Sequence, residues 1–156
     1  MAFAAALVLP GIAYGQFAAT GTTTVSVSIG AEASLQVNTS TTTLTSSGIF
    51  ADYTGTTSLT YKIRTTQSTG SGTITLKVTT DFSPANGPSV ASPPTGGDTL
   101  AYTCTVSAPG TACSGSQTSS TASSTSVATF GAGASSALAG NSASVAWTLK
   151  NDPAYK

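Results

Sequence analysis

Apolar and polar residues alternate over several short stretches of the chain, which is the pattern of half-buried β-strands. The first such stretch spans residues 22–29, where Ser and Thr separate the apolar residues Val25, Val27 and Ile29. The alternation resumes over 33–37, beyond Gly30. We therefore expect one first strand with a bulge or kink at this glycine.

Two further stretches, 59–63 and 73–79, alternate in the same way and are separated by a polar loop. We predict that they pair with each other as an antiparallel hairpin. The following stretch, 83–98, is rich in Pro and Gly, which interrupt a strand. It should therefore form a surface loop.

Later strands are expected over residues 100–106 and 143–149, with a short strand at 127–130. The Ser-, Thr- and Ala-rich stretch 114–126 is typical of an exposed connection. No stretch shows a capped pattern with a period of 3.6 residues, so little helix is expected. About seven short strands joined by Gly, Pro and Ser turns predict an all-β fold. We expect an antiparallel immunoglobulin-like sandwich, in a single domain over residues 16–156.

The amino terminus, residues 1–15, resembles a secretory signal peptide. A short apolar run ends at Leu9, and small residues at Ala13 and Gly15 precede an expected cleavage before Gln16. The run is far shorter than the ~20 residues of a transmembrane helix, and no later stretch is longer, so no membrane span is expected. No Lys or Arg precedes the run, which departs from the signal-peptide pattern. A signal with a truncated start and a buried amino-terminal strand or helix are the alternatives.

Cys104 and Cys113 are the two cysteines of the chain. The residues between them include the turn-forming group Ala108-Pro109-Gly110, so the two sulfurs can meet across a short hairpin. We predict a disulfide, and with it an oxidising compartment. A pair of free thiols is the alternative. A tetrahedral metal site is not expected, because two thiols without further Cys or any His do not complete one.

Five basic and five acidic residues give a formal net charge of zero, and the chain has no histidine. Leu, Ile, Val and Phe make up about 18% of the sequence, but disorder also needs a high net charge, which is absent. The basic residues are too few and too dispersed for a nucleic-acid partner. Without histidine, the commonest general base and the commonest metal ligand are both missing.

The acidic residues do not form a motif for chemistry. No two of them lie close enough in sequence to indicate a paired acid and base or a calcium loop. The abundant serines have no histidine to act as a base, and the glycine clusters lack the Lys of a phosphate loop. We therefore expect no enzyme, no catalytic residues, no metal and no cofactor. The carboxylates are Glu32, Asp52, Asp81, Asp98 and Asp152.

Several aromatic residues, Tyr61, Tyr102 and Trp147, fall in register with aliphatic strand positions, which predicts that they pack in the core. Tyr53 and Phe82 lie in less regular stretches and are the candidates for exposed aromatic rings. Exposed rings can form a flat surface for sugars. A carbohydrate-binding or adhesive module that takes glycans is therefore the alternative function.

The Thr-rich strand at 22–29, the segment 59–78, the cysteine loop and the closing strand at 144–149 together resemble a group of bacterial surface proteins. They are the secreted, pilin-like sandwich proteins of the spore coat protein U group, and the resemblance of pattern covers most of 22–156. It implies a secreted, periplasmic or cell-surface protein. Such a protein would be a non-catalytic subunit or module of a surface fibre or coat, associating with itself or with other surface proteins. The low charge fits self-assembly, because it leaves little repulsion between copies.

The resemblance also implies a final strand after the closing strand, where this sequence ends at Lys156. Two interpretations fit: the sequence is a fragment, or the domain lacks its final strand by design. A sandwich short of one strand exposes an edge and a groove, which chaperone–usher pilins fill with the amino-terminal extension of the next subunit. In this interpretation Val25, Val27 and Ile29 form the donor strand. An ordinary first strand is the alternative role of these residues.

Overall fold

Nine strands, all paired antiparallel, form two sheets in the described part of this computed structural model, residues 24–82 and 86–155. The predicted signal peptide, residues 1–15, lies outside the described residues. In the described ranges the chain has no helix, and so none that is long and apolar enough to cross a membrane. The expected all-β, antiparallel sandwich is confirmed, whereas the immunoglobulin-like topology stays a prediction.

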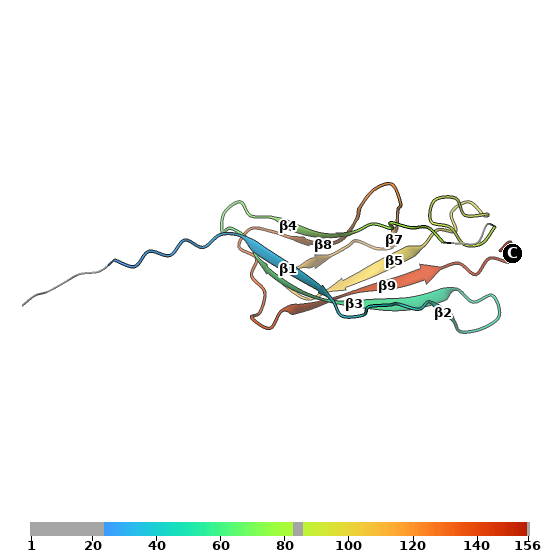
Figure 1. The fold of residues 1–156 in the computed structure, drawn as a ribbon, viewed down its shortest axis with the longest axis horizontal. Helices are drawn as coiled ribbons and strands as arrows, with labels where there is room; N and C mark the ends of the chain where they lie inside the picture. The colour runs from blue at the N-terminus through green and yellow to red at the C-terminus, as the bar shows by residue number, and fades with distance from the viewer. Residues whose placement is uncertain (1–23, 83–85, 156) are drawn as a thin grey trace, which may run out of the picture.

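The two sheets differ in size and lie over each other (Figure 1). The large sheet has the order β1 (Glu32–Val37), β3 (Tyr53–Arg64), β9 (Asn141–Leu149), β5 (Ala101–Val106) and β7 (Gln117–Thr118), and β2 (Thr45–Ser46) also pairs with β3. The small sheet has the order β4 (Gly72–Leu76), β8 (Thr125–Phe130) and β6 (Thr111–Ala112).

The core lies between β3, β9 and β5 of the large sheet and β8 of the small sheet. Alternate residues of each strand point inward, as the sequence pattern predicts. Tyr61 and Tyr102 are almost fully buried, and Trp147 packs against the same cluster, so the predicted core aromatics are confirmed. Both tyrosine hydroxyls have hydrogen-bond partners: Tyr61 donates to the carbonyl of Ser107, and Tyr102 to that of Ser126.

The predicted disulfide between Cys104 and Cys113 is also confirmed. Cys104 lies on β5 and Cys113 directly follows β6. The bond therefore joins the large sheet to the small sheet at the edge where the chain crosses between them.

The predicted hairpin between 59–63 and 73–79 is wrong, although both stretches contain strands. β3 pairs with β1 along one edge and with β9 along the other, which leaves no free edge for β4. The chain therefore crosses to the small sheet after Arg64, and β4 pairs there with β8. The apolar faces of β3 and β4 meet across the core rather than side by side.

The expected first strand is shorter than predicted. β1 spans Glu32–Val37, and residues 24–30 are in no strand. At the other end of the sequence, the last strand, β9, lies in the middle of the large sheet, with β3 and β5 as neighbours. The position next to β9 is therefore filled, and the unpaired edges among the described residues lie elsewhere; one of them is the edge of β4 in the small sheet.

Candidate functional site, an open groove between two strand edges

The inner face of β1 is uncovered. Leu35 and Val37 lie opposite Tyr61 and Leu59 of β3, on the face that points toward the small sheet. Both residues of β3 are buried, yet Leu35 is 50% exposed and Val37 is 55% exposed. The small sheet has three strands in the described residues, and a groove separates its edge strand β4 from β1. The apolar side chains of Leu35 and Val37 are therefore not covered by the small sheet.

A groove follows the uncovered face, between β1 of the large sheet and β4 of the small sheet. It has a volume of about 540 Å³, and residues of β1, β3 and β4 line it. Ile63 and Ile74 contribute apolar side chains that also pack against the core, and Phe130 lines it as well. No strand in the described ranges pairs with the outer edge of β1 or of β4. Each edge therefore presents unpaired backbone groups to the groove.

The charged residues of β1 and β3 alternate with the apolar ones. Glu32 lies opposite Arg64, and Lys62 lies opposite Ser34, in positions that point to the outer face of the large sheet. The inner positions of β1 are Ala33, Leu35 and Val37. The inward positions of β1 are therefore apolar, although the groove lining also includes Glu32, Lys62 and Arg64. This mixed lining suits an uncharged chain segment with apolar side chains on one side.

Residues 24–30 form an exposed segment that runs out from the start of β1, away from both sheets (Figure 1). Val25 is 82% exposed, Val27 77% and Ile29 67%. In an extended chain these alternate residues lie on the same side. The segment therefore presents a row of three apolar side chains with no partner among the described residues.

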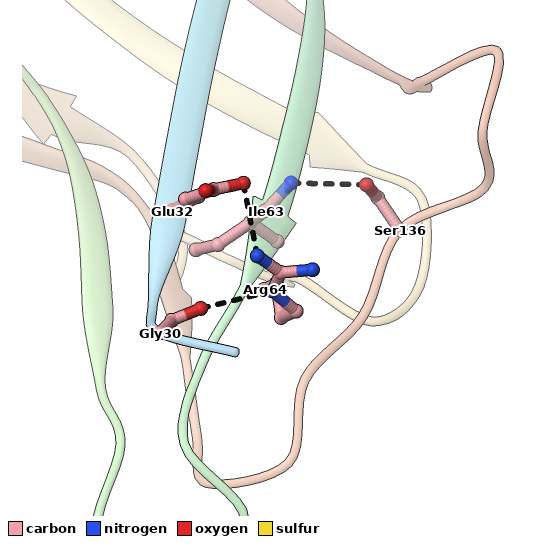
Figure 2. Close-up of polar contacts among 5 residues, drawn as sticks. All are labelled: Gly30, Glu32, Ile63, Arg64 and Ser136. Atoms are coloured by element: carbon pink, nitrogen blue, oxygen red, sulfur yellow. Dashed lines mark hydrogen bonds and ion pairs between the residues drawn. The ribbon is translucent and has the colours of Figure 1, made fainter. Parts of the chain in front are cut away.

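The junction between this segment and β1 is held by Arg64 (Figure 2). Its Nε donates a hydrogen bond to the carbonyl oxygen of Gly30 at 2.9 Å, and its guanidinium lies 3.0 Å from the carboxylate of Glu32. On the other side of β3, the backbone N–H of Ile63 donates to the hydroxyl of Ser136 at 2.9 Å. Polar contacts on both sides of β3 therefore hold the end of this strand in place.

The carboxylates lie apart from the groove, except Glu32. The side chain of Asp81 organises the loop that follows β4: it accepts hydrogen bonds from the backbone of Phe82, Val90 and Ala91 and from the hydroxyl of Ser89. These bonds, above all the one from Val90, lower the pKa of Asp81 to about 2, although partial burial opposes the shift. This is the arrangement of a structural anchor rather than of a general base, which needs a pKa nearer neutrality.

A second charged group, Asp52, pairs with Lys150 at 2.9 Å near the end of β9. The hydrogen bond from the ammonium of Lys150 lowers the pKa of Asp52. Both side chains are substantially exposed, so the pair contributes little to stability. In residues 24–82 and 86–155, no three His, Cys, Asp or Glu side chains gather as metal ligands would.

The two aromatic candidates lie in different surroundings. Tyr53 begins β3 and packs against a second core cluster, formed by Val90, Leu100 and Leu149. Phe82 is 40% exposed and follows Asp81 in the loop after β4. Of the two, Phe82 has the more accessible ring.

The described residues form an antiparallel β-sandwich that has a groove between the unpaired edges of β1 and β4, and an exposed apolar segment at 24–30. No protein-family model, no curated protein and no solved structure matches the chain. The groove and the segment are therefore interpreted from their own geometry.

Alternation along the sequence identified Val25, Val27 and Ile29, but it did not identify the groove. Leu35 follows the same pattern as buried residues such as Leu59, so the pattern does not show that it is uncovered. Arg64 was also missed. The opposite charges of Glu32 and Arg64 are a weak signal, and it becomes informative only when the register of β1 and β3 is known.

Proposed function

We propose that this chain is an exported, non-catalytic structural protein, a subunit or module of a bacterial surface fibre or coat. In this proposal its copies associate through strand addition: the segment 24–29 of one copy occupies the groove between β1 and β4 of another. The observation that carries the proposal is that one chain has both an open groove and an exposed segment of matching pattern.

The match between segment and groove extends to length and spacing. The segment has three apolar residues at alternate positions, and the uncovered inner face of β1 has three inward positions, Ala33, Leu35 and Val37, of which the first two line the groove. A strand added beside β4 gains backbone hydrogen bonds from that edge, while its apolar side chains cover β1. Burying each Val or Ile contributes roughly 1.5–3 kcal/mol. Part of this gain is offset by the cost of ordering the segment.

The disulfide and the low net charge of the chain support the same proposal. A disulfide in so small a domain is typical of proteins outside the reducing cytoplasm. A formal net charge of zero leaves little electrostatic repulsion between copies that approach closely. The chain has no histidine for general-base chemistry, in agreement with a structural role.

The test is the oligomeric state of the purified chain as a function of concentration, measured by size-exclusion chromatography with light scattering. We expect the parent chain to form oligomers. We expect the triple variant Val25→Ser, Val27→Ser, Ile29→Ser to stay monomeric, because its segment no longer has an apolar row. The matched control replaces the intervening residues instead, Thr24→Ala, Ser26→Ala and Ser28→Ala, and should assemble like the parent.

A peptide of residues 22–30 provides the complementary test, because it offers the donor segment without the rest of a second copy. It should bind the triple Ser variant, whose groove is intact. The proposal is overturned if the parent chain is monomeric at every concentration and the peptide does not bind.

A carbohydrate-binding or adhesive module is the second candidate function, and the exposure of Phe82 favours it. An exposed aromatic ring can stack on a sugar ring. Saturable binding to a glycan panel that is lost in Phe82→Ala but kept in the triple Ser variant would support this candidate.

A further inference from the structure

The nearest groove to the apolar segment is the one in its own chain. Only Gly30 and Ala31 separate Ile29 from Glu32, the first residue of β1, and β1 lines the groove. A three-residue hairpin turn over residues 30–32 would place Val27 opposite Leu35, with the apolar row on the groove side of β1. Gly is well suited to such a turn. Because the two parts are in one chain, their effective concentration is high. Return of the segment to its own groove therefore competes directly with insertion into another copy.

Arg64 holds the chain at the point where that turn would have to form. Its side chain contacts the carbonyl oxygen of Gly30 and the carboxylate of Glu32, one on each side of Ala31 (Figure 2). These two contacts keep residues 30–32 in line with β1. As a result, the segment leaves the domain along the direction of the strand (Figure 1). A hairpin turn over residues 30–32 takes both Gly30 and Glu32 out of line with β1, so both contacts must break.

The backbone that carries Arg64 is itself fixed. Ser136 exchanges two hydrogen bonds with Ile63, one through its hydroxyl and one through its backbone N–H, each 2.9 Å long. On the other side of Arg64, the backbone of Thr65 donates to Ala134, and the buried hydroxyl of Thr65 donates to Gly131. The loop after β8 thus supports the end of β3, and Arg64 contacts the junction from a rigid base.

We propose that Arg64 is a positioning residue that commits the apolar segment to a second copy of this chain, by opposing the turn that would return it to its own groove. The inference rests on the proposed strand addition. It goes beyond it by naming the residue that favours insertion into a second copy over return to the same chain. Assembly then depends on two exposed contacts at one junction, and not only on the fit of segment to groove.

The test uses the full chain with an added cysteine pair, Val27→Cys in the segment and Leu35→Cys on the inner face of β1. Mild oxidation links the two positions within one chain or between chains. Non-reducing electrophoresis separates the two products as a monomer and a ladder. The native cysteines are already paired with each other, so they leave the added pair free to react. Thermal unfolding of each variant checks that it is folded.

In this background we expect mainly the ladder. Arg64→Ala should shift the ratio of within-chain to between-chain links upward by roughly three- to tenfold, as expected for the loss of one exposed hydrogen bond and one exposed ion pair. The matched control is Lys77→Ala, which removes the same charge from an exposed residue that does not line the groove and should leave the ratio unchanged. Glu32→Gln, which removes only the ion pair, should give a smaller shift in the same direction.

The inference is overturned if Arg64→Ala and Lys77→Ala give the same ratio, or if the background already links mainly within the chain. Both results leave strand addition itself intact. If the background forms neither kind of link, the segment does not reach a groove at all, and the proposed function fails together with the inference.

Discussion

Leu35 on β1 lies directly opposite Tyr61 on β3, yet Tyr61 is 2% exposed and Leu35 is 50% exposed. The two side chains point to the same face of the large sheet. Tyr61 is covered by Phe130 of β8, whose ring centroid lies 5.1 Å away, whereas Leu35 lines the open groove. This difference between neighbouring residues marks the boundary of the core and the start of the groove.

Leu35→Ala should therefore affect association more than folding. Because Leu35 is half exposed, we expect its loss to cost about 1 kcal/mol or less in the free energy of unfolding. The matched control is Leu59→Ala, one strand away on the same face but buried, which should cost about 2–5 kcal/mol. Urea unfolding of monomeric samples measures both values. Equal losses would show that β1 is covered in the monomer, and that the groove is closed.

Asp81→Asn should loosen the loop that follows β4. The amide keeps one oxygen acceptor but loses the charge, and with it the charge-assisted hydrogen bonds from Val90, Ala91 and Ser89. We expect a loss of about 1–2 kcal/mol at neutral pH, measured by chemical denaturation. An unchanged stability would mean that Asp81 does not anchor the loop.

The same residue predicts a pH dependence. The pKa of Asp81 is about 2 in the folded chain, below its ordinary value of 3.8. Its carboxylate therefore stabilises the folded state above about pH 4, and this contribution is lost as the pH falls from about 4 toward 2. The difference in stability between the parent and Asp81→Asn should shrink over this range. A difference that stays constant down to pH 2 would contradict the assigned role.

Gly110→Ala should destabilise the core without touching the groove. An added Cβ would lie 2.6 Å from Cγ1 of Val106 and 2.8 Å from Cε1 of Phe130, closer than side chains tolerate. Overpacking of this kind costs about 1–3 kcal/mol, which thermal unfolding detects as a lower midpoint. Gly48→Ala is the control, because its Cβ would meet nothing within 4 Å. If both variants melt like the parent, the packing around Gly110 is looser than described.

Reduction of the disulfide between Cys104 and Cys113 should lower the free energy of unfolding by about 2–3 kcal/mol, because the bond closes a short loop in the unfolded chain. Denaturant unfolding with and without a reductant measures the difference. The double variant Cys104→Ala, Cys113→Ala should match the reduced parent and be insensitive to the reductant. Two free thiols in non-reducing mass spectrometry of protein from an oxidising compartment would contradict the bond.

Local patterns predicted much of the fold correctly. Alternation located β3, β5 and β9, because each of them has one buried face and one exposed face. The cysteine pair was predictable as well, because the turn between the two residues is short and local. The segment that carries Val25, Val27 and Ile29 was also visible in the sequence, as an apolar row without charges.

In contrast, the order of the strands in the sequence did not predict which strands pair with each other. The stretches at 59–63 and 73–79 follow each other closely and have the same pattern, yet they lie in different sheets. β9 occupies the edge of β3 that β4 would have needed, although it comes from the far end of the sequence. Which strand pairs with a given edge depends on segments far apart in the sequence. It therefore cannot be predicted from any one short stretch.

The amino-acid sequence was enough to predict half-buried strands, a disulfide and an uncharged apolar row near the amino terminus, because each of these features is local. Which inward-facing residues are covered depends on how the two sheets pack. Leu35 and Leu59 have the same local pattern, and they differ because three strands of one sheet face a wider sheet and stop short of β1. The groove, and the position of Arg64 beside it, result from this mismatch in width, which arises only when the two sheets pack together.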